Sequence, residues 1–478
     1  MTKKILIAII ACLACATLAA GQVFSAGDKV PVPEQKGAPQ YPAAVAFDDY
    51  DAKAAVCESN PVDEKFIDSI NNFAAESSSK LLRRRADNYT YSPISAYMAL
   101  SLATAGSNGD TQHELLEVLD IDKKQGISYL AAQNANLFRR MYLDNDMGKL
   151  KIANSLWLGD DLTFNQDYLD TATGQFYASL FNVDFADNKT GELMGQWIAE
   201  NTNGTLAPKM EVDKDLCMSI INTVYFKDQW INKFDKSATK KDTFYKADGT
   251  TVQCDFMNQV FSSHSFVDGK NYTASSLGLK NGGAMNFILP DKGVEVYDLL
   301  SSADKVSDLL KGGEEKNGMV TFKLPKFSFD TDIDLGGTLK DLGVKKAFTD
   351  TADFSGISTD QGLFISEVKQ QTHVAIDENG VEASAFTEIG MAGPSLYLYH
   401  HRPQRCHHVY GRHQRPHAKI NADALTSPLR GYRRLGERKS RSVCPGFFVL
   451  SEKIRPRQSI AGAIFEFKQL SIQLRVFF

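Results

Sequence analysis

The sequence predicts a mixed α+β fold in which helices and strands follow one another irregularly around a large core. Helical and strand-like segments are interspersed without the regular alternation of a doubly wound sheet, and no internal repeat is present. The hydrophobic fraction of 43% and the aromatic fraction of 10% suffice for a substantial core. These observations favour an α+β domain over a repeat or a doubly wound architecture.

Apolar residues at helical spacing predict three early helices. The first runs from Phe66 to Leu82, the second from Pro93 to Gly106 and the third from Thr111 to Leu119. Later apolar runs have strand character instead. These runs cover residues 152–158, 220–226, 285–289, 320–324 and 363–368, with a further one around Val374 and Ile376.

The N-terminus has the features of an export signal over residues 1–20. Lys3 and Lys4 precede an apolar run at residues 5–11, which is too short to span a bilayer. The segment ending at Cys12 resembles a lipoprotein signal, in which this cysteine is acylated and attaches the chain to a membrane. The alternative is cleavage after Ala16 or Ala20, which would release a soluble protein. We therefore expect a secreted or lipid-anchored protein, located outside the cell or in its envelope.

Residues 21–60 are predicted to be a flexible tether, because much of this stretch is rich in alanine, proline and acidic residues and has no core of its own. Charge is divided unevenly along the chain. The net charge is −5, but residues 396–478 carry 16 Lys and Arg against 4 Asp and Glu, which leaves a net charge of −17 on residues 1–395. An acidic body of this kind does not favour nucleic-acid binding.

Motifs for catalysis, metals or disulfides are not found. The chain has no G-x-S-x-G nucleophile elbow, no H-E-x-x-H zinc helix and no phosphate loop. The series Asp330, Asp332, Asp334 resembles the start of a calcium loop, but Leu335 stands where that loop needs glycine. The cysteines outside the signal show no paired spacing. They are Cys57, Cys217, Cys254, Cys406 and Cys444. We therefore assign no catalytic residue, cofactor or metal site, and expect a protein that is not an enzyme.

One segment, residues 378–387, has an unusual pattern. The pair Asn379-Gly380 forms a flexible hinge, and the strand-like run that follows alternates with a period of two. One face of the run carries small residues, and the other carries polar ones. The small face consists of Val381, Ala383, Ala385 and Thr387. The polar face consists of Glu382, Ser384 and Glu388. A strand with one small-residue face behind a hinge could slide between neighbouring strands without steric conflict.

This segment, which begins at Glu378, resembles the reactive-loop hinge of serpins, the serine protease inhibitor family. Other motifs resemble the family in order and spacing over roughly residues 66–390. They are Ser92-Pro93-Ile94-Ser95 (the shutter), Trp197 to Gly204 (the helix that crosses the main sheet), Asn222 to Trp230 (the central strand and breach), Phe287 to Pro290, Leu324 to Phe327, Leu342 to Phe348 and Asp353 to Ser355. The resemblance implies a serpin domain over residues 61–395, with mixed sheets, surrounding helices and an exposed reactive-centre loop.

The resemblance also implies a function. A serpin offers its loop as bait to a serine protease, forms an acyl-enzyme, and traps the protease when the cleaved loop inserts into the main sheet. We expect such an inhibitor here, acting as a monomer on a serine protease, with a cysteine protease as the alternative target. The second interpretation is a serpin-fold binding protein without inhibitory activity, or a truncated product without function. The small hinge residues favour the inhibitor.

The position of the scissile bond has two interpretations. Family spacing from Gly380 places the bond at Pro394-Ser395, but proline before the bond suits few proteases. A shorter loop would place it at Met391-Ala392. The candidate region therefore spans Met391, Ala392, Gly393, Pro394 and Ser395.

The chain after residue 395 does not resemble the family. Lysine dominates the basic residues before this point and arginine dominates after it, and six of the nine histidines lie between His400 and His417. Such a change in composition indicates a shifted reading frame, so residues 396–478 are predicted to be a basic tail outside the family fold, with the C-terminal strands missing. A metal site at His413 and His417, with Cys406, His407 and His408 nearby, is disfavoured by the irregular spacing. A basic tail that binds nucleic acid or membrane is the other alternative.

Overall fold

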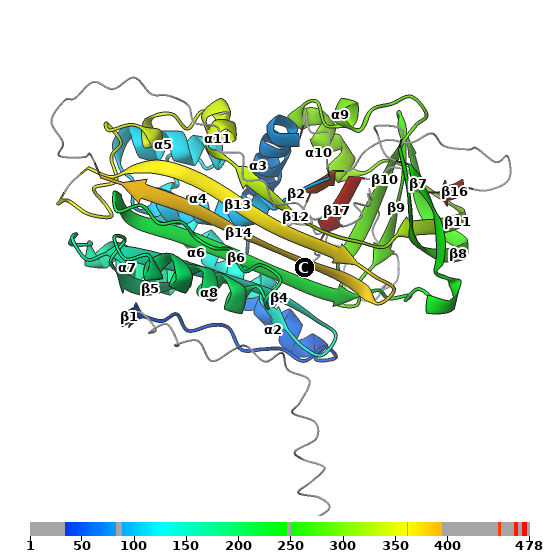
Figure 1. Cartoon of the computed structure of the whole chain (residues 1–478), viewed down its shortest axis with the longest axis horizontal. Helices are drawn as coiled ribbons and strands as arrows, with labels where there is room; N and C mark the ends of the chain where they lie inside the picture. The colour runs from blue at the N-terminus through cyan, green and yellow to red at the C-terminus, as the bar shows by residue number, and fades with distance from the viewer. Residues whose placement is uncertain are drawn as a thin grey trace, which may run out of the picture. The chain divides into compact units, whose positions relative to one another are not determined.

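The computed structural model describes residues 34–82, 88–245, 250–360 and 362–393, together with three short strands near the C-terminus. The described part has two sheets with helices packed against them (Figure 1). The first sheet has the strand order β1-β5-β4-β6-β14-β13-β12, and β3 pairs with β4 at its side. Its strands are β1 (Glu34–Gly37), β3 (Leu143–Asp144), β4 (Gly148–Gly159), β5 (Ala178–Val183), β6 (Leu216–Gln229), β12 (Phe327–Asp334), β13 (Phe364–Ile376) and β14 (Gly380–Ala392).

The strand β14 lies in the middle of this sheet, between β6 and β13, and is antiparallel to both (Figure 1). Its last residue, Ala392, pairs with Leu216 and Phe364, which are the first residues of β6 and β13. The inserted strand therefore occupies the sheet along the length of its neighbours. The sequence predicts an exposed loop here, but the structure has a buried central strand instead. The physical reason is that β14 satisfies backbone donors and acceptors on both neighbouring strands.

The second sheet has the order β16-β11-β8-β9-β10-β17-β15-β2, and β7 pairs with β8. These strands are β2 (Tyr89–Tyr91), β7 (Lys240–Tyr245), β8 (Thr251–Gly269), β9 (Tyr272–Gly278), β10 (Ala284–Pro290), β11 (Glu315–Pro325), β15 (Phe448–Leu450), β16 (Ala463–Glu466) and β17 (Ser471–Arg475).

Three of these strands come from the tail. The strand β17 pairs with β10 and β15, β15 pairs with β2, and β16 runs parallel to β11. The prediction that the tail stands outside the fold and that the C-terminal strands are missing therefore does not hold for these three segments. Each is a short apolar or alternating stretch, which is compatible with a place in a sheet. Whether residues 396–478 come from a shifted reading frame stays a prediction.

Three of the helices lie where apolar periodicity predicts them. They are α2 (Tyr50–Ser59), α3 (Glu64–Leu82), α4 (Pro93–Ala105), α5 (Gly109–Val118), α6 (Gly126–Met141), α7 (Gln166–Gln175), α8 (Lys189–Asn201), α9 (Val296–Leu299), α10 (Ala303–Lys311) and α11 (Gly336–Leu342), with single 3₁₀ turns at Lys236–Ala238 and Lys346–Phe348. The three helices predicted first correspond to α3, α4 and α5. In the described part of the chain, no helix is long and apolar enough to cross a membrane.

Two helices cover the first sheet near the inserted strand. The buried helix α4 packs against β6 and β14, and α8 packs against β4 and β6. Nearly every residue of α4 is buried, which is why this helix is apolar around its whole circumference and not amphipathic. A small second core lies on the α8 side and includes Trp157, Phe181, Ile198 and Phe386. The first sheet is therefore covered on both faces around β14.

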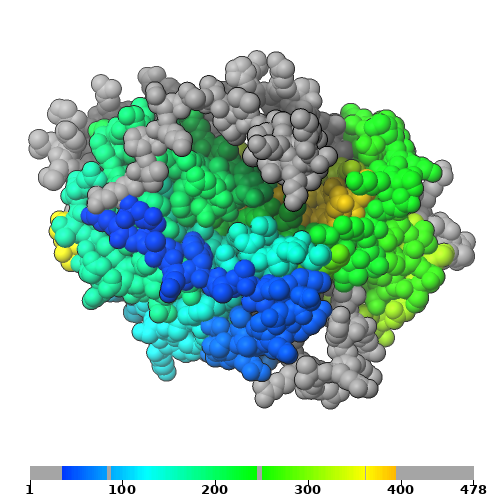
Figure 2. Space-filling model, turned by 90° about the horizontal axis from the view of Figure 1, so that it is seen from below, coloured from blue at the N-terminus to red at the C-terminus, as the bar shows by residue number. Residues whose placement is uncertain are grey.

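The N-terminal segment is ordered where a tether was predicted. The strand β1 pairs with β5 at the edge of the first sheet, and α2 contacts α6. The centroid of the Tyr41 ring lies 6.1 Å from the ring centroid of Phe138 and 6.0 Å from that of Tyr142. Figure 2 shows this segment in dark blue, lying against the blue-green part of the chain. The tether prediction is therefore wrong for residues 34–60, because backbone pairing and aromatic contacts hold them against the domain.

Candidate functional site

The hinge predicted at Asn379-Gly380 is the turn of a hairpin that joins β13 to β14. Asp377 Oδ1 accepts hydrogen bonds from the backbone amides of Asn379 at 2.7 Å and Gly380 at 3.1 Å. A Cβ atom at Gly380 would lie only 2.0 Å from the carbonyl oxygen of Asp228, so this position needs glycine because the β6 backbone approaches closely. Asparagine and glycine thus shape the point where the chain enters the sheet.

The turn is held by residues that were predicted and by others that were not. Trp230 is fully buried, and its Nε1 donates to the carbonyl of Asp377 at 2.8 Å. The carboxylate of Glu378 accepts hydrogen bonds from Lys326 Nζ and Thr239 Oγ1, each at 2.8 Å. Burial raises the pKa of Glu378, but the bonds from Lys326, the backbone and Thr239 outweigh burial and hold this pKa below its ordinary value.

The face of β14 toward α4 carries the small residues that the period-two pattern singles out. Val381, Ala383 and Ala385 are at most 3% exposed and belong to the main core. Farther along the strand, Ile389 and Met391 face the same core and are fully buried. The core-facing residues are therefore small in the first half of the strand and larger in the second half, and the buried polar residue between them, Thr387, is hydrogen-bonded.

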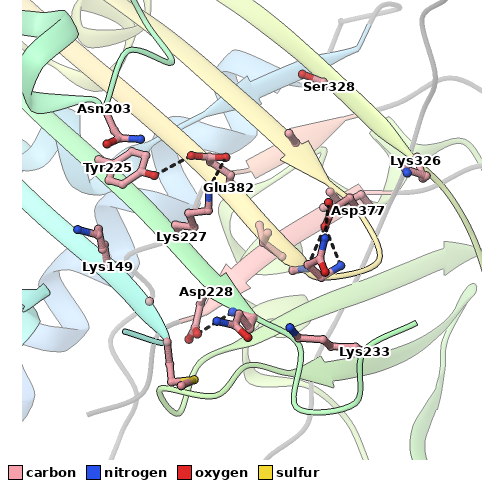
Figure 3. A pocket seen from close by; sticks show the side chains of 18 of the residues that line it. Lys149, Asn203, Tyr225, Lys227, Asp228, Lys233, Lys326, Ser328, Asp377 and Glu382 are labelled. Atoms are coloured by element: carbon pink, nitrogen blue, oxygen red, sulfur yellow. Dashed lines mark hydrogen bonds and ion pairs between the residues drawn. The ribbon is translucent and has the colours of Figure 1, made fainter. Parts of the chain in front are cut away.

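Polar groups on the opposite face have specific partners. Glu382 accepts hydrogen bonds from Tyr225 at 2.6 Å and from Lys227 at 3.1 Å, as Figure 3 shows. Ser384 Oγ lies 2.6 Å from Thr205 Oγ1, on the loop that follows α8. The ring of Phe386 lies on this face too, in the small core under α8, where it is 2% exposed.

The predicted shutter residues meet the inserted strand at Thr387. Its Oγ1 atom lies 2.8 Å from Ser95 Oγ and 2.8 Å from Gln370 Nε2. The same Gln370 amide accepts a hydrogen bond from the amide of Ser92 at 2.8 Å and donates to the Ser92 carbonyl at 3.0 Å. Pro93 follows as the first residue of α4, a position that suits proline because its missing N–H would have no helical partner. The start of α4 is thus tied to both β13 and β14.

Asn222 pairs with Thr387 in the strand register, on the other side of β14. Its Nδ2 donates to Asn154 Oδ1 at 2.9 Å, and Asn154 Nδ2 in turn donates to the carbonyl of Phe176 at 2.6 Å. This chain links β6 to β4 and to the end of α7. The buried amides therefore extend the polar network of the shutter across three neighbouring strands.

The candidate scissile residues lie at the other end of β14. Met391 is fully buried and Ala392 is 9% exposed, so a protease cannot reach their peptide bond in this conformation. Gly393 is the last described residue here, and Pro394 and Ser395 lie outside the described residues. Cys12 and the histidine-rich part of the tail also lie outside them.

A cavity of about 960 Å³ opens at the hinge end of the strand (Figure 3). It is lined by the entry of β14, by the end of β6 and by the turn between β3 and β4. Its charged side chains carry both signs. They include Lys149, Lys227, Lys233, Lys326, Asp146, Asp228, Asp377 and Glu382. Among the described residues, no three His, Cys, Asp or Glu side chains form a group that could hold a metal ion.

The structure brings the predicted residues together around a single strand. Trp230 at the breach contacts the turn that leads into β14, and Ser95 at the shutter contacts Thr387 within the strand. Several partners were missed, above all Gln370, Thr239 and Ser219. Their side chains are common polar types in unremarkable surroundings, so only the pairing of distant strands reveals their roles.

Comparisons with known proteins agree with this geometry. Residues 68–408 match the family model of the serpins, described as serine protease inhibitors. Serpin-Z1A of Triticum aestivum is 30% identical over 322 residues, which cover 64% of this chain and 80% of the relative. The thyroxine-binding globulin of Rattus norvegicus is 29% identical over 319 residues, which cover 63% of this chain and 73% of that protein.

A solved structure extends the likeness to the fold. The thermophilic serpin tengpin in its latent state has a TM-score of 0.63 and 28% identity, and the match covers 69% of this chain and 90% of tengpin. The α+β serpin fold predicted from the motifs is confirmed by such neighbours. Members of this family are generally inhibitors and not catalytic enzymes. From the family model and the fold together, the chain belongs to the serpin family.

Proposed function

We propose that the protein inhibits a serine-type endopeptidase as a suicide substrate, by inserting its cleaved loop into the first sheet. The observation that carries the proposal is the fit of β14. The residues facing the core are small at the entry, and the polar residues Glu382, Ser384 and Thr387 each have a partner in the sheet. A loop whose role was only to bind another molecule would have no need of such partners.

The chemistry follows from this fit. The hydroxyl oxygen of the protease serine attacks the scissile carbonyl, the peptide bond breaks, and an ester joins the protease to the new C-terminus of the loop. The leaving amine takes a proton and stays with the C-terminal part of the inhibitor. Insertion of residues 380–392 then adds backbone hydrogen bonds to both β6 and β13, and it carries the attached protease away from the hinge end of the sheet.

This proposal requires two conformations of the same chain. In the first, the loop is outside the sheet and open to a protease. In the second, described above, it is the strand β14. A non-inhibitory binding protein remains the alternative, since a thyroxine-binding globulin is among the relatives.

A protease panel distinguishes these functions. Freshly purified protein is incubated with chymotrypsin-like, subtilisin-like and papain-like enzymes, and the products are separated on denaturing gels. We expect at least one serine protease to give a band that resists denaturation, with the summed mass of the protease and the inhibitor body. Cleavage near residues 391–395 without such a band, for every enzyme in the panel, would favour a substrate or a binding protein over an inhibitor.

We further propose that the protein works outside the cell or in its envelope, as a monomer, and that acylated Cys12 attaches it to a membrane. The support is the basic and apolar sequence of residues 1–20. Metabolic labelling with a radioactive fatty acid tests the anchor. The wild-type chain should incorporate label and C12S should not, whereas equal labelling of both would rule out this cysteine.

A further inference from the structure

Glu388 is a carboxylate in the distal part of β14, on the same face as Glu382. Glu382 keeps a side chain that is 26% exposed and is paired with Lys227, but Glu388 is only 4% exposed. Ser219 Oγ on β6 donates a hydrogen bond to Glu388 Oε1 at 3.0 Å. A hydroxyl donor carries no charge, so this bond does not neutralise a buried carboxylate.

Two charged groups on β13 act on Glu388, and they have opposite signs. From β13 come Lys369, which is its partner in the strand register, and Glu367, whose carboxylate lies 2.5 Å from Lys369 Nζ. The lysine is therefore shared with a second carboxylate, and Glu211 also acts on it from the segment after α8. From β6 the facing group is Ser219.

A cavity of about 360 Å³ lies at this end of the sheet, beside Glu367 and Lys369. Its lining includes Glu211, Asp213 and Asp215 from the segment after α8, as well as Glu367 and Lys369. Burial, and next the charge of Glu367, raise the pKa of Glu388 from 4.5 to about 7. The geometry and the charges thus agree that the carboxylate is more easily accommodated in the sheet when it carries a proton.

We propose that protonation of Glu388 favours insertion of β14, so that the protein traps a protease more completely in a mildly acidic medium than in an alkaline one. This inference rests on the proposed function, because it assumes that residue 388 moves from solvent into the sheet. In solvent the carboxylate has its ordinary pKa, so the inserted form binds the extra proton between about pH 4.5 and pH 7. Lowering the pH through this interval therefore shifts the balance toward insertion, by up to about a hundredfold.

Thermal unfolding of the loop-inserted protein tests the effect of Glu388 protonation without any protease. The melting temperatures of wild type and E388Q are compared from pH 5.5 to pH 8.0, so that titrations common to both cancel in the difference. We expect E388Q to melt higher than wild type at pH 8.0 and the gap to narrow as the pH falls to 5.5. A gap that does not change with pH would overturn the inference.

Two further variants sharpen this comparison. E382Q is the matched control, because Glu382 lies on the same face of the same strand but reaches solvent. Its melting temperature should follow the wild-type pH profile in shape.

S219A removes the hydrogen bond that favours the ionised carboxylate of Glu388, so the transition in melting temperature should move to higher pH. A S219A profile that moves to lower pH would contradict the assignment.

The second readout is the ratio of trapped to released protease on denaturing gels. We expect this ratio to rise more steeply for wild type than for E388Q between pH 8.0 and pH 6.0, because the protease's own pH dependence is common to both. Parallel profiles would overturn the inference. Absence of complexes for both variants at every pH would instead refute the proposed function, and the thermal comparison would still decide whether Glu388 senses pH in the sheet.

Discussion

Gln370 on β13 and Thr387 on β14 are joined by a hydrogen bond of 2.8 Å between Nε2 and Oγ1. The same glutamine side chain is bound to both backbone groups of Ser92, at the start of α4. Gln370 and Thr387 are both fully buried. The glutamine therefore connects the inserted strand, its neighbour and the start of the helix beneath them.

Replacing Gln370 should destabilise the loop-inserted form. Q370A leaves the Ser92 amide without its acceptor and leaves the Thr387 hydroxyl with one partner fewer, so we expect a loss of about 1–3 kcal/mol in the free energy of unfolding. Denaturant titration measures this loss. Q371A is the matched control, since Gln371 lies on the opposite face of the same strand and is only half-buried. Equal effects of the two variants would contradict the role given to Gln370.

The ion pair between Glu378 and Lys326 should make the hinge sensitive to acid. The pKa of Glu378 is held below its ordinary value, so its contribution to stability is present above that ordinary value and is lost as the pH falls through the lowered one. K326Q should therefore lower the melting temperature at pH 7, and the difference from wild type should shrink as the pH falls through the lowered pKa and the carboxylate is protonated. A difference that is constant from pH 7 to pH 3 would show that the pair does not set the pKa of Glu378.

Conversion between the two proposed conformations should be visible as a change in thermal stability. A preparation that inhibits protease has its loop outside the sheet, so cleavage within residues 388–396 should raise its melting temperature as the new strand pairs with β6 and β13. A preparation already in the inserted form should resist that cleavage, because Met391 is buried. If cleavage leaves the melting temperature of an inhibitory preparation unchanged, this protein inhibits without inserting its loop into the sheet.

The α+β class, the early helices and the strands around Ile221 and Phe287 could be predicted from sequence because each is set by local apolar periodicity. The small face of the loop at Ala383 and Ala385 could be predicted for the same reason. The inserted position of the loop could not, since the same alternating pattern suits a strand both inside and outside the sheet. Gln370 lies 278 residues from Ser92, and Ser219 lies 169 residues from Glu388, so only strand pairing reveals these contacts.

The ordered N-terminal segment and the tail strands show a second limit of sequence reasoning. The Ala- and Pro-rich composition of residues 34–60 suits a tether, but Tyr41 contacts three aromatic rings and β1 extends the sheet. Composition describes the average of a segment. A single aromatic contact and a few backbone hydrogen bonds can nevertheless decide whether that segment packs against the domain. The basic composition of the tail likewise conceals the short stretches that form β15, β16 and β17.

The origin of the tail is testable with DNA and protein. We expect the coding sequence near codon 395 to contain, in another frame, a segment with the family's C-terminal strand motifs. We expect a protein made from that frame to melt at a higher temperature than the 478-residue chain, because longer strands in place of the short β17 would cover more of β10, where Met285 and Phe287 belong to the core. If the 478-residue chain melts as cooperatively and traps a protease equally well, the tail is a working part of the fold.

The fate of the acyl-enzyme in a hinge variant tests the central claim most directly. A383R would bury an unpaired charge in the core beneath β14. V381R would do the same two residues earlier, on the same face of the strand. On denaturing gels, the wild type and the control E382Q should give protease complexes, whereas A383R and V381R should be cleaved at the loop and release active protease. Complexes formed by A383R at the wild-type yield would contradict the account, because the trap would then work without insertion of this strand.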